Sequence, residues 1–195
     1  MSDKQSPRVP MLPVEEAERR AEAAGLNPAF GRLNVFRILL QNEPVAREVG
    51  KTLNMLIFDG NVLDGRLREL LIMRIGWMTG AVYEWTSHWR VARGMDIPEA
   101  DLLAVRHWQD SELFSAADRA ILQATDDCLE HGFIQDGTWE EVCKHVETEA
   151  ERVELVIAIG NWSLFSQLLQ SLNVPLEDGV DAWPPDGKAP HGLSA

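Results

Sequence analysis

Apolar residues recur every three to four positions from about residue 13 to residue 174 of this chain of 195 residues. Such spacing lines one side of an α-helix. A half-buried strand needs alternation with a period of two, and no stretch sustains it between hairpin turns. The pattern therefore predicts an all-α fold, a single-domain helical bundle of about eight or nine helices. The length is sufficient for one domain with a sizeable core.

We expect three parts along the chain. Residues 1–13 are polar and proline-rich, which is typical of a flexible arm. Residues 14–174 form the helical domain, and residues 149–173 are either one long final helix or a broken pair. Residues 175–195 are rich in proline and glycine, which favour an irregular tail.

Several helix ends are marked by capping residues. Asn27 and Pro28 predict the start of one helix over residues 27–41. Asp64 predicts the start of a helix that ends near Gly80. Two pairs have the spacing of a capping box and predict further helix starts: Ser115 with Asp118, and Thr138 with Glu141.

The charge and hydropathy of the chain argue against two classes of partner. A net charge of −13 repels phosphate backbones and anionic lipid surfaces. No apolar run approaches the roughly 20 residues of a membrane span, and no signal peptide is visible. We therefore expect a cytoplasmic protein that binds neither nucleic acid nor membranes.

Cysteine and metal chemistry are both weakly indicated. Cys128 and Cys143 fit neither a CxxC redox pair nor a zinc site, so we expect reduced structural thiols. One histidine and two glutamates could mimic a carboxylate-rich metal site, but neither HExxH nor Glu-x-x-His is present. We expect no metal and no other cofactor.

The stretch RELLIMRIGWMTGAVYEWTSHWRVARG, residues 68–94, keeps polar groups in a run that is otherwise suited to burial. Its first half is apolar around nearly the whole helix, which is typical of a buried helix. Glu69 and Arg74 are then buried, and a buried charge costs several kcal/mol unless it is paired. Glu69 should therefore have partners, and its pKa should be displaced. The nearby candidate partners are Arg66, Arg68 and Arg74.

Glu84 and His88 are four residues apart, so they share one face of the next helix. A carboxylate beside an imidazole can serve as base and acid near neutral pH. Tyr83, the only tyrosine, could donate a hydrogen bond to an oxyanion. The alternative is a solvated pair that stabilises the helix. Tryptophans of this segment could wall a pocket for a ring-shaped ligand, or simply pack in a core.

Residues 66–95, RLRELLIMRIGWMTGAVYEWTSHWRVARGM, resemble the carboxymuconolactone decarboxylase family, which shares its fold with alkylhydroperoxidase D. With its flanks, the resemblance covers about residues 10–178. It implies an alkylhydroperoxidase D-like bundle and a symmetric homo-oligomer, a trimer or dimer. In the peroxidase branch a glutamate precedes a CxxC pair that a histidine follows. Here Glu69 and His88 take those places, while Ala81 and Glu84 stand where the cysteines would be.

The resemblance implies a cofactor-free acid/base enzyme, a lyase or isomerase, acting on a small cyclic carboxylic acid or lactone by decarboxylation or isomerisation. His88 with Glu84 would deliver the proton, and Glu69 would orient His88. The remaining assignments are Tyr83 as stabiliser of an enolate, Arg74 as holder of a substrate carboxylate, and Trp77 and Trp85 as further substrate-binding residues.

Two other functions stay open. The chain can be a non-catalytic oligomer that binds a small molecule, or an accessory protein. Alkylhydroperoxidase-type antioxidant activity is disfavoured, because peroxide reduction through a disulfide needs an attacking thiolate and a resolving thiol. Hydrolysis is a further alternative to decarboxylation and isomerisation.

Overall fold

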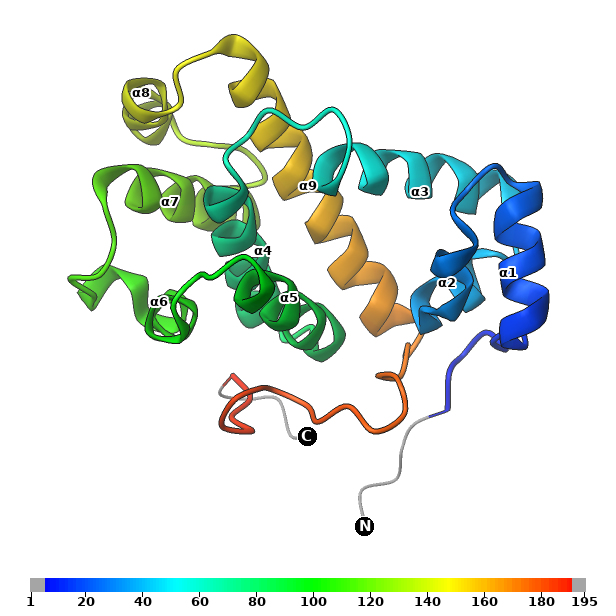
Figure 1. Cartoon of the computed structure of the whole chain (residues 1–195). Coiled ribbons are helices and arrows are strands. Elements are labelled where there is room, and N and C mark those ends of the chain that lie inside the picture. The colour runs from blue at the N-terminus through cyan, green and yellow to red at the C-terminus, as the bar shows by residue number, and fades with distance from the viewer. Residues whose placement is uncertain (1–5, 191–195) are drawn as a thin grey trace. The chain divides into compact units, whose positions relative to one another are not determined.

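The computed structural model describes residues 6–190, and these residues form helices and no strand (Figure 1). The predicted all-α fold is confirmed. Residues 1–5 of the predicted arm and 191–195 of the predicted tail lie outside the described residues. None of the described helices has the length and apolarity that a bilayer span requires. The helices are α1 (Val14–Ala23), η1 (Pro28–Arg32), α2 (Asn34–Leu39), α3 (Glu43–Ile57), α4 (Gly65–Thr79), α5 (Val82–Gly94), α6 (Glu99–Ala104), η2 (Val105–Asp110), α7 (Ala116–His131), α8 (Asp136–His145) and α9 (Glu149–Ser171).

The chain packs as two compact units. The first comprises Met1–Asn61 and Leu168–Val180, and the second comprises Val62–Gln167 and Asp181–Ala195. Helix α9 is continuous, which settles the alternative of a broken pair, and it contributes residues to both units. The boundaries 1–13, 14–174 and 175–195 remain a prediction.

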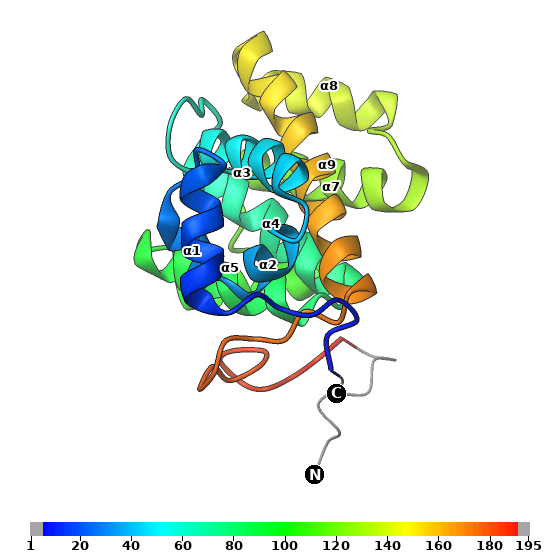
Figure 2. The same ribbon diagram turned by 90° about the vertical axis from the view of Figure 1, so that its right-hand side faces the viewer.

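In the first unit, α1 packs against η1 and α2 (Figure 2). One helix was expected over residues 27–41, and this was wrong, because the chain is extended at Leu33 and two short helices form. Asn27 does cap the first of them, as predicted. The packing explains the split. Gly31 lies so close to α1 that a Cβ atom would come 2.4 Å from the backbone nitrogen of Glu18.

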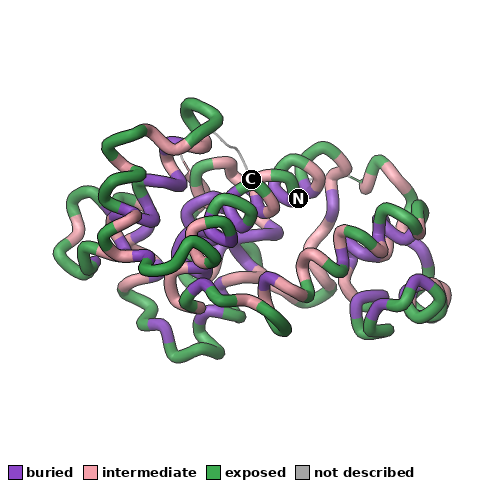
Figure 3. The backbone as a smooth tube through the Cα atoms, turned by 90° about the horizontal axis from the view of Figure 1, so that it is seen from above, coloured by how far each residue is buried: buried purple, intermediate pink, exposed green. Residues whose placement is uncertain are grey.

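Helix α4 is the centre of the second unit and packs against α5 and α7. Asp64 caps it by accepting hydrogen bonds from two backbone amides, as predicted. Backbone drawn as buried runs through the inner helices in Figure 3. A buried helix with apolar side chains all round was expected, and the fully buried side chains are Leu70, Leu71, Ile72, Met73 and Ile75.

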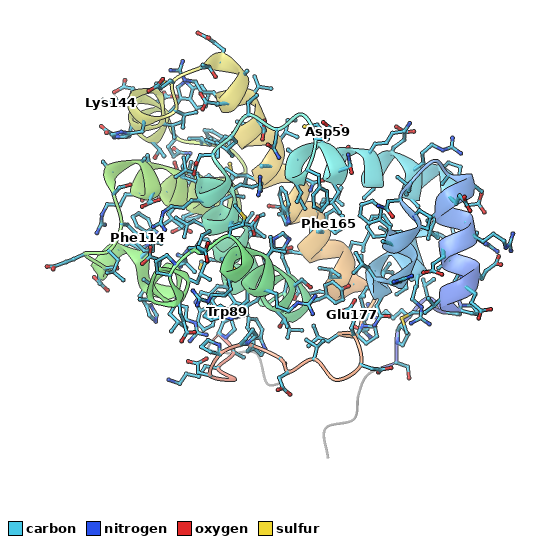
Figure 4. All side chains as sticks on the ribbon, in the orientation of Figure 1. Asp59, Trp89, Phe114, Lys144, Phe165 and Glu177 are labelled. Carbon is cyan, nitrogen blue, oxygen red and sulfur yellow. The ribbon has the colours of Figure 1, made fainter. Side chains whose placement is uncertain are left out.

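Aromatic side chains fill much of the core of the second unit. They come from α4, α5, η2 and the segment after residue 181, and Trp89 and Phe114 are labelled in Figure 4. Trp85 stacks on Trp89 with ring centroids 6.0 Å apart. Large rings bury much apolar area with few rotamers to fix, so this cluster sets α5 rigidly against its neighbours.

Candidate functional site

Two glycines set the geometry of the α4–α5 hairpin that carries the predicted site. Gly80 ends α4 with a φ of 72°, a left-handed conformation that glycine adopts without a steric penalty. Gly76 lets the two helices approach, because a Cβ atom there would lie 3.0 Å from the backbone nitrogen of Trp85. The close approach brings Glu69 of α4 within reach of His88 of α5.

Glu69 is fully buried and is bonded through both carboxylate oxygens. Oε2 lies 2.8 Å from Nδ1 of His88, and Oε1 accepts a hydrogen bond of 3.1 Å from Nε of Arg68. Burial raises the pKa of Glu69, but the His88 ring and the Arg68 guanidinium outweigh it, so the net pKa is lowered. The carboxylate is therefore ionised and paired, as a buried charge must be.

Both ring nitrogens of His88 have partners. Nε2 lies 3.0 Å from Nε1 of Trp162 on α9. An indole N–H can only donate, so Nε2 accepts, and in the neutral ring the proton sits on Nδ1 and points to Glu69. The ring is thus fixed in tautomer and orientation. Its side chain is 12% exposed, which leaves a small accessible edge.

Glu84 lies one turn before His88 on α5, and its pKa is shifted in the opposite direction to that of Glu69. Its Oε2 accepts a hydrogen bond of 2.9 Å from Oγ of Ser166, and its buried Oε1 has no partner among the described residues. Burial raises the pKa of Glu84 well above its ordinary value, and the Ser166 bond opposes this only in part. The fold therefore favours the protonated, uncharged form of this carboxyl group.

The structure brings His88 together with Glu69 and not with Glu84. Each of the two α5 residues instead has a partner on α9: His88 with Trp162, and Glu84 with Ser166. Both pairs are four residues apart, so one face of α5 meets one face of α9 with the chain directions opposed. Thr79, at the end of α4, lies 3.1 Å from the Ser166 hydroxyl and completes the polar layer.

Sequence reasoning missed Trp162 and Ser166. The available signal was their spacing of four residues within a helix, which equals the spacing of Glu84 and His88. That signal does not say which two helix faces meet, because the contact is made across 74 and 82 residues of chain. Arg68 was one of three arginines proposed to pair with Glu69, and it is the one that does.

The other predicted site residues lie elsewhere in the second unit. The Arg74 guanidinium binds both carboxylate oxygens of Asp126 and donates to the backbone carbonyls of Val105 and Arg106. Tyr83 is buried on α5. Trp77 and Trp85 are in the aromatic cluster, where their ring centroids are 5.3 Å apart.

The two cysteines do not pair with each other. Cys128 and Cys143 are both free and half-buried. Burial and the neighbouring Asp127 raise the pKa of Cys128, which disfavours the thiolate that peroxide chemistry needs. Within residues 6–190, no group of three or more histidine, cysteine, aspartate or glutamate side chains gathers as metal ligands.

Replacing Glu84 with glutamine is expected to remove a pH-dependent cost. The folded pKa is raised above the unfolded value of 4.5, so the unfolded chain releases this proton first as the pH rises. Wild-type stability then falls, relative to Glu84→Gln, by about 1 kcal/mol per pH unit from the unfolded pKa up to the folded pKa. Urea unfolding between about pH 5 and pH 8 measures the difference.

The matched control is Glu112→Gln, because Glu112 is exposed. Its stability difference from the wild type should not change over the same pH range. A difference that stays equally flat for Glu84→Gln would contradict a protonated, buried Glu84.

Comparison with known proteins agrees with the fold. A model of the carboxymuconolactone decarboxylase family matches residues 45–127, which include Glu69, Glu84 and His88. No curated protein sequence matches the chain significantly. Solved structures share the fold at low identity, and three of them are described below.

An uncharacterized peroxidase-related protein from Silicibacter sp. TM1040 is 14% identical with a TM-score of 0.72, over 92% of this chain and 97% of that one. An alkylhydroperoxidase AhpD core protein from Ralstonia eutropha JMP134 is 14% identical with a TM-score of 0.71, over 88% and 93%. A cysteine-to-alanine variant of the debrominase Bmp8, in complex with 2,3,4-tribromopyrrole, is 16% identical with a TM-score of 0.69, over 90% and 95%.

At these identities the solved structures speak for the fold alone. The family model and the fold agree with each other, and with the resemblance that residues 66–95 carry. Residues 45–127 are thus similar to the carboxymuconolactone decarboxylase family, and the chain has the AhpD-like fold.

Proposed function

We propose that this protein is a cofactor-free acid/base enzyme acting on a small cyclic carboxylic acid or lactone, by decarboxylation or isomerisation. The observation that carries the proposal is the contrast between Glu69 and Glu84. The pKa of Glu69 is lowered and that of Glu84 is raised. Two carboxyl groups driven apart in pKa are the usual arrangement of a paired base and acid. His88 works with both carboxyl groups in this proposal, and the proton on its Nδ1 points to Glu69.

The proton transfer begins with an exchange of hydrogen bonds at His88. Nε2 leaves the Trp162 indole and accepts a proton from the substrate. The imidazolium that forms faces the ionised Glu69 carboxylate at 2.8 Å, which stabilises it. Glu84, which holds its proton, then acts as the acid for the developing product. No outside redox partner is needed. In isomerisation one C–H bond breaks as His88 takes its proton, and another C–H bond forms with the proton of Glu84. In decarboxylation the carboxyl group gives its proton to His88, the bond from the ring carbon to the carboxyl carbon breaks as CO₂ leaves, and its electron pair stays on the ring carbon, which takes the proton of Glu84.

Two further roles complete the proposal. Tyr83, next to Glu84 on α5, is the proposed donor to a developing enolate. For Arg74 to bind a substrate carboxylate, its bidentate ion pair with Asp126 must first open. The debrominase Bmp8, in its complex with tribromopyrrole, binds a small flat ring, which supports a small cyclic substrate here. The cytoplasmic location and the trimer or dimer stay predictions.

Turnover of a small panel tests the proposal directly. The panel contains carboxymuconolactone, its decarboxylated lactone isomers and acyclic acids of the same size, followed by proton NMR and CO₂ release. We expect the wild type to convert at least one cyclic member. The Cys128→Ser, Cys143→Ser double variant should convert it equally fast, because no thiol takes part. Loss of turnover in that variant would mean that a cysteine thiol takes part in the reaction, and would contradict the proposal.

Binding without turnover is the second candidate, and one observation favours it. Both nitrogens of His88 are engaged and the side chain is 12% exposed, so the ring is held nearly closed. A binding protein has no need to free Nε2. This candidate would be favoured over the enzyme if no panel member is converted and calorimetry shows saturable binding of one of them.

A further inference from the structure

Residues 181–190 lie against the aromatic cluster of the second unit, and their ribbon runs beside α5 in Figures 1 and 2. The Trp183 indole is 5% exposed. Its ring centroid lies 6.0 Å from that of Trp77, edge-on, and 6.1 Å from that of Trp85. An aromatic side chain from the end of the chain therefore fills a position that is walled by two other indoles.

Three residues further on, a carboxylate occupies a second position. Asp186 accepts two hydrogen bonds from Arg106, of 2.8 and 3.0 Å, in the fork geometry that guanidinium groups make with carboxylates. The Arg106 bond is the chief reason that the pKa of Asp186 is strongly lowered. This carboxylate is therefore ionised at neutral pH.

Arg106 is held in place from several sides. Its guanidinium carbon lies 4.5 Å from the ring centroid of Trp77 and 4.9 Å from that of Trp85, which are favourable cation–π distances. Arg74 donates to the backbone carbonyl of Arg106 and so fixes η2 beneath it. Nε of Arg106 is buried without a hydrogen-bond partner among the described residues. The end of the chain therefore leaves one donor of this guanidinium unused.

The attachment of the segment is a small set of polar contacts. The Trp85 indole donates to the carbonyl of Pro184 at 2.9 Å, and the Trp183 amide donates to the Thr86 hydroxyl at 3.3 Å. Trp183 has a φ of 56°, a left-handed conformation that is unfavourable for a bulky residue. Packing of the indole thus holds a strained backbone in place, so release of the indole relieves strain.

We propose that Arg106, Trp77, Trp85 and Thr86 form a binding site for a small aromatic carboxylate, and that residues 181–190 are a latch that occupies it. Trp183 stands in for the aromatic ring of the ligand, and Asp186 stands in for its carboxylate. A ligand that carries both groups displaces the latch and makes the same stacking and bidentate contacts. These four residues are not among the hydrogen-bonded partners Glu69, Glu84, His88, Trp162 and Ser166, so the binding test does not depend on the proposed catalysis.

A latch of this kind lowers the apparent affinity for the ligand. The apparent dissociation constant is the intrinsic one divided by the fraction of molecules with the latch open, so a latch closed in nine molecules of ten weakens binding about tenfold. Weakening the latch should therefore tighten ligand binding. This distinguishes a latched site from a segment that is merely part of the core.

The test is calorimetric titration of the full chain with indole-3-acetate, with neutral indole as the comparison ligand. Asp186→Asn removes the charge of the latch and should lower the dissociation constant for indole-3-acetate, by up to about tenfold for a latch that is closed in nine molecules of ten. Asp181→Asn is the matched control, since it makes the same change on an exposed residue of the same segment. The control should bind like the wild type.

Two results would overturn the proposal. One is equal affinity of Asp186→Asn and Asp181→Asn for indole-3-acetate. The other is an Asp186→Asn variant that binds neutral indole as tightly as the carboxylate, because Arg106 then plays no part. Adding Arg106→Lys to Asp186→Asn should weaken binding again, since lysine does not reproduce the bidentate fork.

Hydrogen exchange of the wild type gives an independent reading that needs no variant. In the free protein the Gly187 amide donates to the Trp183 carbonyl at 2.8 Å. Saturating indole-3-acetate should speed exchange at the amides of Trp183, Asp186 and Gly187, because the latch is displaced. Slower or unchanged exchange there, with ligand bound, would contradict displacement.

Discussion

Replacing Glu69 with alanine is expected to lower the free energy of unfolding by about 3–5 kcal/mol, because it removes one partner from a buried ion pair. The Arg68 guanidinium would lose the carboxylate that it bonds at 3.1 Å, and the His88 Nδ1–H would lose its acceptor. The deleted side chain is fully buried, so its absence also leaves a cavity. Denaturant unfolding at pH 7 measures the loss.

The pH dependence of this loss identifies its cause. The folded pKa of Glu69 is lowered relative to 4.5, so its contribution is present above that pH and disappears as the pH falls through the folded value. The stability difference between the wild type and Glu69→Gln should therefore shrink in acid. The control is the exposed Glu130→Ala, for which about 0.5 kcal/mol or less is expected. A loss at Glu69 as small as that would contradict a buried ion pair.

Replacing His88 with alanine is expected to reduce turnover of the substrate identified from the panel by roughly 10²–10⁴-fold. His88 is the group that exchanges a proton with the substrate in the proposed mechanism, and alanine leaves Glu69 with nothing to orient. The far-UV circular dichroism should be unchanged, because the ring contributes to side-chain contacts and not to the backbone of α5.

The matched control is His107→Ala, because His107 is exposed on η2. Its kcat and kcat/KM should equal those of the wild type. A His88→Ala variant that keeps wild-type kcat, with intact structure, would remove His88 from the mechanism.

The sequence predicted the helices well where the signals are local. Asp64, Gly80 and the capping box of Ser115 with Asp118 mark helix ends that the structure confirms. Thr138 with Glu141 has the same spacing, but the prediction there was wrong. Thr138 lies inside α8, and its hydroxyl bonds Asp127 instead. Thr148 and Glu151 make the reciprocal bonds at the start of α9.

Only those features of the site that follow from burial of a charged group could be predicted from the sequence. A carboxylate in an apolar helix must have partners, which is why Glu69 could be expected to find an arginine and to have a displaced pKa. Which groups meet His88 and Glu84 depends on how α9 packs against α5, and no local pattern reports that. For the same reason the sequence did not reveal that Asp186 reaches Arg106, 80 residues earlier in the chain, or that Trp183 packs on Trp77 and Trp85.

The central claim is that His88 accepts a proton from the substrate, and that Glu84 then delivers a solvent-derived proton to a carbon of the product. Turnover in D₂O, followed by mass spectrometry and NMR of the product, tests it most directly. The wild type should yield product with one deuterium at the reacting carbon, and His88→Ala should yield it roughly 10²–10⁴-fold more slowly. Product without deuterium, or deuteration by His88→Ala at the wild-type rate, would contradict the claim.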